Sequence, residues 1–218
     1  RADARLEGDG RVLDARLDVV AGRRSFYRNG KRCQASDMPE ALMSVIFSPD
    51  DLALVKRGAS VRRDELDDFG RQANRGYANV LLAYQRSIEQ RNRLLKEEFP
   101  DEGLLDAWDA SVSLGGATLL HARLRMFARL APRVSEVYAR VSGGERLECS
   151  YVSSLGDDLG DLTRDELRDL LAERLALVRD EDLRRRQTCV GPHRDDVSFV
   201  IEGRDARHFG SQGQQRSV

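Results

Sequence analysis

The first part of the chain alternates apolar and polar residues in short runs. Residues 4–6 and 12–20 carry this alternation on either side of a Gly-Asp-Gly turn, and residues 25–27 lead into Asn29-Gly30. Asn-Gly is a strong two-residue turn signal because both positions accept a positive φ. The pattern therefore predicts two antiparallel hairpins at the start of the chain.

The middle of the chain changes to a helical period. Residues 61–98 lack proline and repeat apolar residues every three or four positions, which predicts one long helix with Gly76 as the candidate break. A second apolar stripe runs through residues 104–141, where Pro132 predicts a kink and Ser142-Gly143-Gly144 predicts the end. Two long helices joined by a short turn must lie antiparallel and bury their stripes against each other.

Shorter elements flank this helical pair. Before it, Ser48 and Pro49 predict the start of a short helix that runs to about Lys56. After it, residues 147–152 alternate like a strand, and a capping box at Thr163 predicts a helix to about Arg186. A further strand over residues 197–201 ends in a tight turn. The order of elements indicates an α+β fold.

The end of the chain contains a second capping box, in which Ser211 is followed three residues later by Gln214. This spacing predicts a helix that starts at Ser211. Free N–H groups at such a start also suit an anion, and Gly213 lets a ligand approach the backbone closely. The spacing alone leaves both an ordinary cap and a phosphate site open.

Composition adds little about partners, but the distribution of charge is uneven. The net charge is −1, hydrophobic residues make up 40% and charged residues 33% of 218 residues. Residues 56–96 carry ten Lys or Arg against five Asp or Glu, and residues 157–182 carry ten acids against four Arg. One part of the surface is therefore expected to be basic and another acidic.

Cysteine usage and hydropathy favour a reducing cytoplasm. The three cysteines are far apart and form no paired motif, so neither a disulfide framework nor a zinc site is indicated. No apolar run approaches the roughly 18 residues of a membrane span, and no signal peptide is visible. We therefore expect no membrane partner and no metal ligands within this chain.

Several runs of residues carry a family resemblance. Near the end these are GPHRDD at 191–196 and FGSQGQQR at 209–216; earlier ones are FSPDDL at 47–52, YQR at 84–86, QRNRLLK at 90–96, SGGE at 142–145 and SY at 150–151. Together they resemble the RecF family of bacterial DNA replication and repair ATPases over residues 45–218. Arg57, Ala59 and Glu65, in the loop before the long helix, depart from the family pattern.

The resemblance implies a fold and a division of the chain. The fold is the antiparallel strands of an ABC-ATPase head plus a long antiparallel helical arm. Residues 1–48 would form the β-rich part of the head, residues 49–187 the arm, and residues 188–218 the return to the head with the signature motif. In that family Ser211 and Gly213 would contact the γ-phosphate of ATP on the opposite subunit, supported by Gln212, Gln214 and Gln215.

The resemblance also implies cofactors, partners and a cellular role. ATP and Mg²⁺ are the expected cofactors of the complete protein. Its expected partners are DNA, a second copy in an ATP-dependent homodimer and other recombination mediator proteins. Its expected setting is the bacterial cytoplasm, near the nucleoid, in recombinational repair and the SOS response. Loading of a recombinase on single-stranded or gapped DNA is the implied outcome.

Two motifs of an ATPase are missing from this sequence. There is no G-x-x-x-x-G-K-[ST] loop for the β- and γ-phosphates. There is also no apolar strand that ends in Asp-Glu, because residues 200–201 run into a hairpin turn. The chain by itself is therefore not expected to hydrolyse ATP and supplies no catalytic residue of its own.

The basic residues between 62 and 96 are the candidate DNA contacts: Arg62, Arg63, Arg71, Arg75, Arg91, Arg93 and Lys96. They would bind phosphates without reading bases. A solvated helix face is the alternative for each of them. His193 lies beside two aspartates but lacks the spaced ligands of a metal site, so a structural anchor is favoured over a contact near the nucleotide.

Two other functions remain open. A non-enzymatic helical module could dock a partner of a recombination complex through the arm, with Ser211 as a simple cap. Head domains of the chromosome-maintenance type are the other possibility, but their arms extend into much longer heptad coiled coils than the roughly forty-residue helices expected here.

Overall fold

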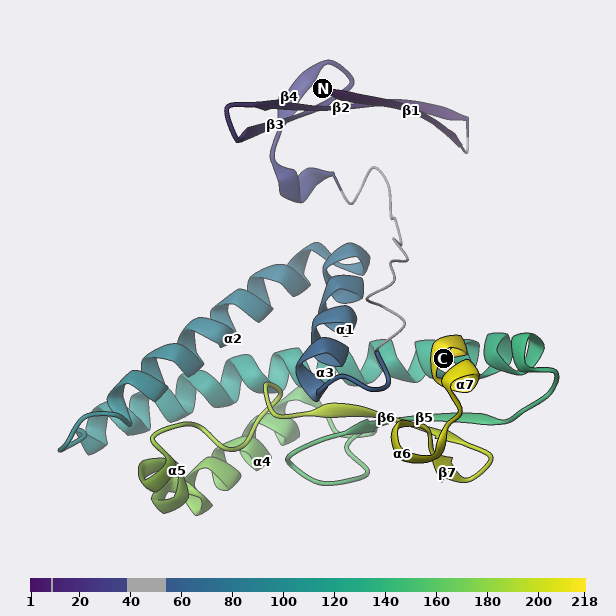
Figure 1. Cartoon of the computed structure of the whole chain (residues 1–218). Helices are drawn as coiled ribbons and strands as arrows, with labels where there is room; N and C mark the ends of the chain where they lie inside the picture. The colour runs from purple at the N-terminus through teal and green to yellow at the C-terminus, as the bar shows by residue number, and fades with distance from the viewer. Residues whose placement is uncertain (9, 39–53) are drawn as a thin grey trace. The chain divides into compact units, whose positions relative to one another are not determined.

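The computed structural model describes residues 1–8, 10–38 and 54–218. The chain divides into two compact units, Arg1–Phe47 and Ser48–Val218 (Figure 1). Each unit contains an antiparallel sheet, and the second also contains the long helices. The predicted α+β class is confirmed. The short helix predicted from Ser48 to about Lys56 falls largely outside the described residues.

The first unit is a four-stranded antiparallel meander. Its strands are hydrogen-bonded in chain order: β1 (Ala2–Gly8), β2 (Arg11–Val20), β3 (Arg23–Arg28) and β4 (Lys31–Cys33), followed by the short 3₁₀ helix η1 (Ala35–Asp37). The predicted Asn-Gly turn joins β3 to β4, with φ values of 49° at Asn29 and 77° at Gly30. Asn29 Oδ1 also accepts a hydrogen bond from Asp14 N at 2.9 Å, which fixes the turn to β2.

The predicted helix over residues 61–98 is two helices, α1 (Ala59–Ala73) and α2 (Arg75–Leu94). The break lies at Asn74, whose backbone is extended (φ −150°, ψ 121°). Its side chain accepts a hydrogen bond from Gly76 N at 2.7 Å and so caps α2. An asparagine that satisfies the first N–H groups of a helix favours a new start over continuation. An uninterrupted helix is therefore excluded, and the break lies two residues before the candidate Gly76.

The longest helix, α3 (Glu102–Ser142), begins where Asp101 accepts a hydrogen bond from Leu104 N. It continues through Pro132 and ends at Gly143, which has a left-handed φ of 80°. Figure 1 shows α2 and α3 side by side, and they share buried apolar residues such as Leu81, Tyr84 and Val112. The predicted antiparallel helical arm is confirmed.

A second sheet and several shorter helices follow α3 in the chain. The sheet has the order β5 (Leu147–Val152), β6 (Asp196–Ile201) and β7 (Arg204–Asp205). Between β5 and β6 lie α4 (Arg164–Leu177) and α5 (Arg179–Arg185), and after β7 come α6 (Ala206–Phe209) and α7 (Gln212–Ser217). The Thr163 capping box opens α4 as predicted, but Val178 divides the predicted helix into α4 and α5.

The core of the second unit consists of separate apolar clusters. The largest joins α2, α3 and α4 around Tyr84, Leu120 and Leu171. Another joins the end of α3 to the second sheet and α6 through Tyr138, Leu147 and Ala206. Strand β5 lies in the predicted arm and pairs with β6 of the predicted head, inside one compact unit. The boundaries at 48/49 and 187/188 stay predictions.

Candidate functional site

The helix α7 begins at the capping box that the sequence predicts. Ser211 Oγ accepts a hydrogen bond from Gln214 N at 3.2 Å, and Ser211 N donates to Gln214 Oε1 at 2.8 Å. Both partners of the box are therefore satisfied locally. The serine hydroxyl still carries its own proton, so it can donate a further hydrogen bond to a ligand while it caps the helix.

The glutamines of this helix are held in different environments. Gln215 is only 6% exposed, and its Nε2 donates to the carbonyl oxygens of Ala206 at 2.8 Å and Arg207 at 3.2 Å. Gln214 is half-buried, and its Nε2 donates to Glu145 Oε1 at 2.9 Å. Gln214 and Gln215 therefore fix the helix to the protein rather than offer their amides to solvent.

Ser211, Gln212 and Gly213 form the exposed side of the motif, and we call these three residues the signature face. A hydroxyl, a side-chain amide and backbone N–H groups at a helix start are donors that suit phosphate oxygens. A glycine at the centre of the face lets a ligand approach the backbone. This donor set suits a phosphate group in general. The five residues that were predicted to contact ATP therefore divide into three exposed residues, 211–213, and two glutamines that are bonded internally.

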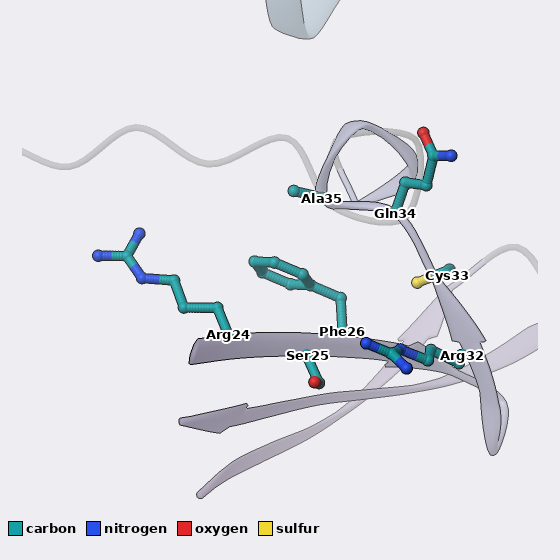
Figure 2. A pocket seen from close by; sticks show the side chains of 7 residues that line it. All are labelled: Arg24, Ser25, Phe26, Arg32, Cys33, Gln34 and Ala35. Atoms are coloured by element: carbon teal, nitrogen blue, oxygen red, sulfur yellow. The ribbon is translucent and has the colours of Figure 1, made fainter. Parts of the chain in front are cut away.

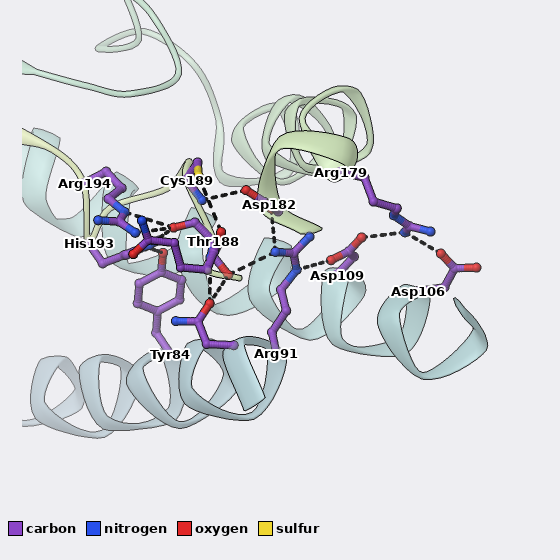
Figure 3. A network of polar contacts seen from close by, with 12 residues as sticks. Tyr84, Arg91, Asp106, Asp109, Arg179, Asp182, Thr188, Cys189, His193 and Arg194 are labelled. Carbon is purple, nitrogen blue, oxygen red and sulfur yellow. Dashed lines mark hydrogen bonds and ion pairs between the residues drawn. The ribbon is translucent and has the colours of Figure 1, made fainter. Parts of the chain in front are cut away.

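Arg91 is fully buried, which corrects its prediction as a DNA contact (Figure 3). Its Nε donates to Asp109 Oδ1 at 2.5 Å, and its Nη1 donates to Asp182 Oδ2 at 2.6 Å and to Thr188 Oγ1 at 3.0 Å. Asp182 is 0% exposed and Asp109 is 8% exposed. The guanidinium therefore neutralises two carboxylates inside the protein and is not available to phosphates.

The Arg91 cluster joins segments that lie far apart in the sequence. Asp182 on α5 also accepts a hydrogen bond from Cys189 N at 2.8 Å. Asn92 Oδ1 accepts from both the backbone N and the hydroxyl of Thr188, at 2.6 and 2.8 Å. The two arm helices and α5 are thereby tied to the loop that leads into β6, as Figure 3 shows.

Arg62 is also buried, at 5% exposure, and its prediction as a DNA contact is corrected in the same way. Its Nε and Nη2 form a bidentate pair with Asp196 at 2.7 and 2.9 Å. Its Nη1 donates to the carbonyl oxygens of Leu54 at 3.0 Å and Arg57 at 2.6 Å. A planar guanidinium with this many internal acceptors ties α1 to the start of β6.

The remaining basic candidates are more accessible. Arg71, Arg93 and Lys96 are exposed, and Arg71 forms an ion pair with Asp68. Arg63 is half-buried and donates to the carbonyl oxygen of Asp195 at 2.7 Å. The side chain of Arg75 lies outside what the structure describes. Arg93 lies near the end of α2, where its Nη1 donates to Gln90 Oε1 at 3.3 Å, and Lys96 follows just after the helix.

His193 is held as a neutral anchor. Tyr84 Oη donates to His193 Nδ1 at 2.7 Å, and His193 Nε2 donates to the carbonyl oxygen of Thr188 at 3.1 Å. Burial lowers the pKa of His193 to about 4, so the ring is uncharged at neutral pH. Both ring nitrogens are used internally, which agrees with the interpretation of this residue as a structural anchor.

Asp195 is likewise an internal acceptor rather than a ligand. It is 1% exposed and accepts hydrogen bonds from Tyr151 Oη at 2.8 Å and Ser154 N at 2.7 Å. Burial raises the pKa of its carboxyl group, and these hydrogen bonds act in the opposite direction. Within the described ranges, no group of three or more His, Cys, Asp or Glu side chains is placed to hold a metal ion.

The sequence did not single out a further buried arginine, Arg123 on α3. It is 2% exposed, and its Nε and Nη2 pair with Asp67 at 2.9 and 2.8 Å. Its Nη1 donates to the carbonyl oxygen of Pro192 at 2.7 Å. An arginine placed among the apolar positions of a long helix was the available signal. This pair ties α1 and α3 to the same loop as Arg91.

The first unit has an open pocket of about 410 Å³ near its last strand (Figure 2). Arg24 and Arg32 stand around Phe26, and the Cys33 side chain lies beside them. The described side chains here lack the buried, converging polar groups of a specific binding site.

No helix among the described residues is both long and apolar enough to cross a bilayer.

Comparison with known proteins gives a consistent picture. No family model matches the chain. A DNA replication and repair protein RecF from Pelotomaculum thermopropionicum is 37% identical over 222 residues, which cover 98% of this chain and 59% of the relative. The corresponding protein of Symbiobacterium thermophilum is 44% identical over 181 residues, covering 82% of this chain and 48% of the relative.

Two solved structures are similar over nearly the whole chain. One is the recombination mediator protein RecF-ATPrS in the RecFOR pathway, with a TM-score of 0.86, 31% identity, and coverage of 99% of this chain and 58% of that one. The other is RecF-ATP in the same pathway, with a TM-score of 0.82, 31% identity, and coverage of 94% and 56%. The chain therefore spans less than two thirds of the length of the relatives it matches.

Proposed function

Since the chain belongs to the RecF family over the part that it spans, we propose that it supplies the arm and the signature motif of a DNA replication and repair protein. The complete protein would bind ATP with Mg²⁺, dimerise when ATP is bound and help to load a recombinase on DNA. It would work in the bacterial cytoplasm, near the nucleoid, with other recombination mediators, as part of recombinational repair and the SOS response.

The observation that carries the proposal is the division of the signature motif. Gln214 and Gln215 are anchored inward, whereas Ser211, Gln212 and Gly213 are exposed together at a helix start. We propose that the signature face contacts ATP held by a second copy, so that each site is completed in trans. Fixed N–H and hydroxyl donors stabilise phosphoryl charge by electrostatic positioning, which is the main protein contribution to phosphoryl transfer.

Enzyme activity would belong to the dimer of the complete protein. This sequence has no phosphate loop, so this chain alone is proposed to be inactive. The complete protein is proposed to be a weak, DNA-dependent ATPase. ATP supplies the phosphoryl group that is transferred to water, and the exposed donors of this chain would orient the γ-phosphate across the dimer interface.

Replacing Ser211 by arginine in the complete protein tests this role. The large side chain removes the hydroxyl and blocks the signature face, so we expect ATP-driven dimerisation and ATP hydrolysis to be lost while ATP binding to the single subunit remains. Sedimentation velocity with and without ATP measures the first effect. Ala172→Arg, which adds the same side chain at an exposed position of α4, is the control. Normal dimers with the Ser211 variant would refute the assignment.

DNA binding is proposed for the exposed basic residues that remain after Arg62 and Arg91 are set aside. Replacing Arg93 and Lys96 together by glutamate is expected to weaken DNA binding. The slope of log K against log salt should fall by about 0.9 for each duplex phosphate contact that is lost. Arg129→Glu, an exposed charge reversal on α3, is the matched control. An unchanged slope in the double variant would remove this pair from the DNA surface.

The alternative is a non-enzymatic helical interaction module. Phe99 in the turn between the arm helices is 85% exposed, and Leu104 nearby is 53% exposed. Such apolar side chains are the kind that a docking module uses. Calorimetry of the complete protein with ATP separates the two functions. A protein that neither binds ATP nor dimerises with it would favour the module.

A further inference from the structure

Glu145 joins the end of the arm helix α3 to helix α7, which begins at the signature face. Its Oε2 accepts a hydrogen bond from Tyr138 Oη at 2.8 Å, and its Oε1 accepts one from Gln214 Nε2 at 2.9 Å. Tyr138 lies on the last turns of α3, and Gln214 is the third residue of α7, whose N-cap is Ser211. A single carboxylate therefore joins the end of α3 to α7, and its residue Glu145 is 69 positions away from Gln214 in the sequence.

The Glu145 carboxylate is itself held in place. It follows the left-handed turn at Gly143 and Gly144, where Gly144 N donates to the carbonyl oxygen of Ala139 at 2.8 Å. Glu145 N donates to Ser142 Oγ at 3.1 Å. The backbone that carries Glu145 is thus hydrogen-bonded to the last turn of α3.

Tyr138 provides a rigid partner for this carboxylate. It is 1% exposed and packs in the apolar cluster with Leu147, Ile201 and Ala206. Burial and the hydrogen bond to Glu145 raise the pKa of Tyr138 to about 12, so the phenol keeps its proton and donates. A buried tyrosine with one fixed acceptor has little freedom, because leaving its hydroxyl unpaired would cost free energy.

The side-chain amide of Gln214 satisfies both of its hydrogen bonds in only one of its two flipped orientations. Its Oε1 accepts from Ser211 N at 2.8 Å and its Nε2 donates to Glu145. Turning the amide over would set a donor against Ser211 N and an acceptor against the carboxylate. The bond to Glu145 therefore selects the orientation in which Gln214 completes the cap of Ser211.

We propose that Glu145 is a positioning residue that holds the signature helix in one orientation relative to the end of α3. The expected effect on ATP-dependent dimerisation rests on the proposed function, whereas the expected effect on helix α7 rests only on the contacts described above. Glu145 itself is not proposed to contact nucleotide. It acts through Gln214 and Ser211, which set how the signature face is presented.

Two substitutions at Glu145 separate positioning from charge. Glu145→Ala removes both hydrogen bonds. Glu145→Gln can keep both, because its amide oxygen accepts from Gln214 while its NH₂ donates to the Tyr138 hydroxyl, which then acts as an acceptor. Positioning therefore predicts a defect in the alanine variant and rescue in the glutamine variant. Tyr138→Phe removes only the bond on the arm side and should give an intermediate effect.

The first experiment needs no nucleotide. Hydrogen exchange of the complete protein, measured by mass spectrometry, is expected to be faster over residues 211–217 in Glu145→Ala and near wild type in Glu145→Gln. Peptides from α4 should be unchanged in both variants. Equal exchange in wild type and Glu145→Ala would overturn the inference. If Glu145→Ala does not fold, Tyr138→Phe is compared with wild type instead, and the same peptides decide.

The second experiment is an ATP titration of dimerisation by sedimentation velocity. Glu145→Ala is expected to need roughly three- to thirtyfold more ATP, in the range of couplings transmitted between neighbouring elements. Glu145→Gln should need a near-normal amount. If Ser211→Arg is defective and Glu145→Ala is normal, the positioning role fails and the proposed function stands. If Ser211→Arg dimerises normally with ATP, the proposed function fails, and the hydrogen-exchange data still test the positioning role of Glu145.

Discussion

Replacing Arg91 by methionine is expected to lower the free energy of unfolding by about 3–5 kcal/mol, the range for removing one partner of a buried ion pair. The methionine fills much of the space, but Asp109 and Asp182 lose the guanidinium that both contact. Asp182 is fully buried, so its charge has no access to water. Urea unfolding followed by circular dichroism measures the change.

A neighbouring residue supplies the control for this prediction. Arg93→Met makes the same substitution at an exposed position of α2 and should change stability by less than about 0.5 kcal/mol. Adding Asp182→Asn to Arg91→Met should recover part of the loss, because the amide oxygen can still accept from Cys189 N without an unpaired charge. A loss below about 1 kcal/mol for Arg91→Met would contradict the buried network.

Replacing Gly116 by valine is expected to destabilise the arm by about 1–3 kcal/mol through overpacking. A Cβ atom at this position would lie 2.5 Å from Leu171 Cδ2 and 3.0 Å from Tyr84 Cε2. Both side chains are buried to 1% exposure or less, so neither can move into solvent. The effect should appear as a lower midpoint of thermal unfolding.

The adjacent glycine separates packing from helix propensity. At Gly115 an added Cβ would lie 3.6 Å from the nearest Tyr84 atoms, which is an ordinary contact. Gly115→Ala should therefore stabilise the protein by up to about 1 kcal/mol, because alanine favours the helix interior. Destabilisation by both substitutions to a similar degree would show that helix α3 is sensitive to any change here rather than to the close approach of α4.

Local signals in the sequence were good predictors of structure. The capping boxes at Thr163 and Ser211 and the turn at Asn29 depend on residues within four positions of each other, and the structure contains all three. The break at Asn74 depends on an equally local hydrogen bond, but Gly76 was the stronger sequence signal for a break. The observed break therefore lies two residues from the predicted one.

Contacts over long distances in the sequence could not be predicted. Arg62 pairs with a carboxylate 134 residues away, and Arg91 pairs with one 91 residues away. In the sequence each of them resembles exposed neighbours such as Arg93. The resemblance to a family identified the motif at residues 211–216 as a unit. Which of its side chains face outward depends on Glu145 and the α6 carbonyls, and no spacing rule reveals that.

The length of α3 has a mechanical consequence. At about 1.5 Å per residue, its 41 residues make a rod of roughly 60 Å between the Asp101 cap and the Gly143 turn. A tilt of about 5° around the Gly143 end would therefore carry the far tip through about 5 Å, by the same helix geometry. The Tyr138–Glu145 contact lies at the end where such a tilt would move atoms least.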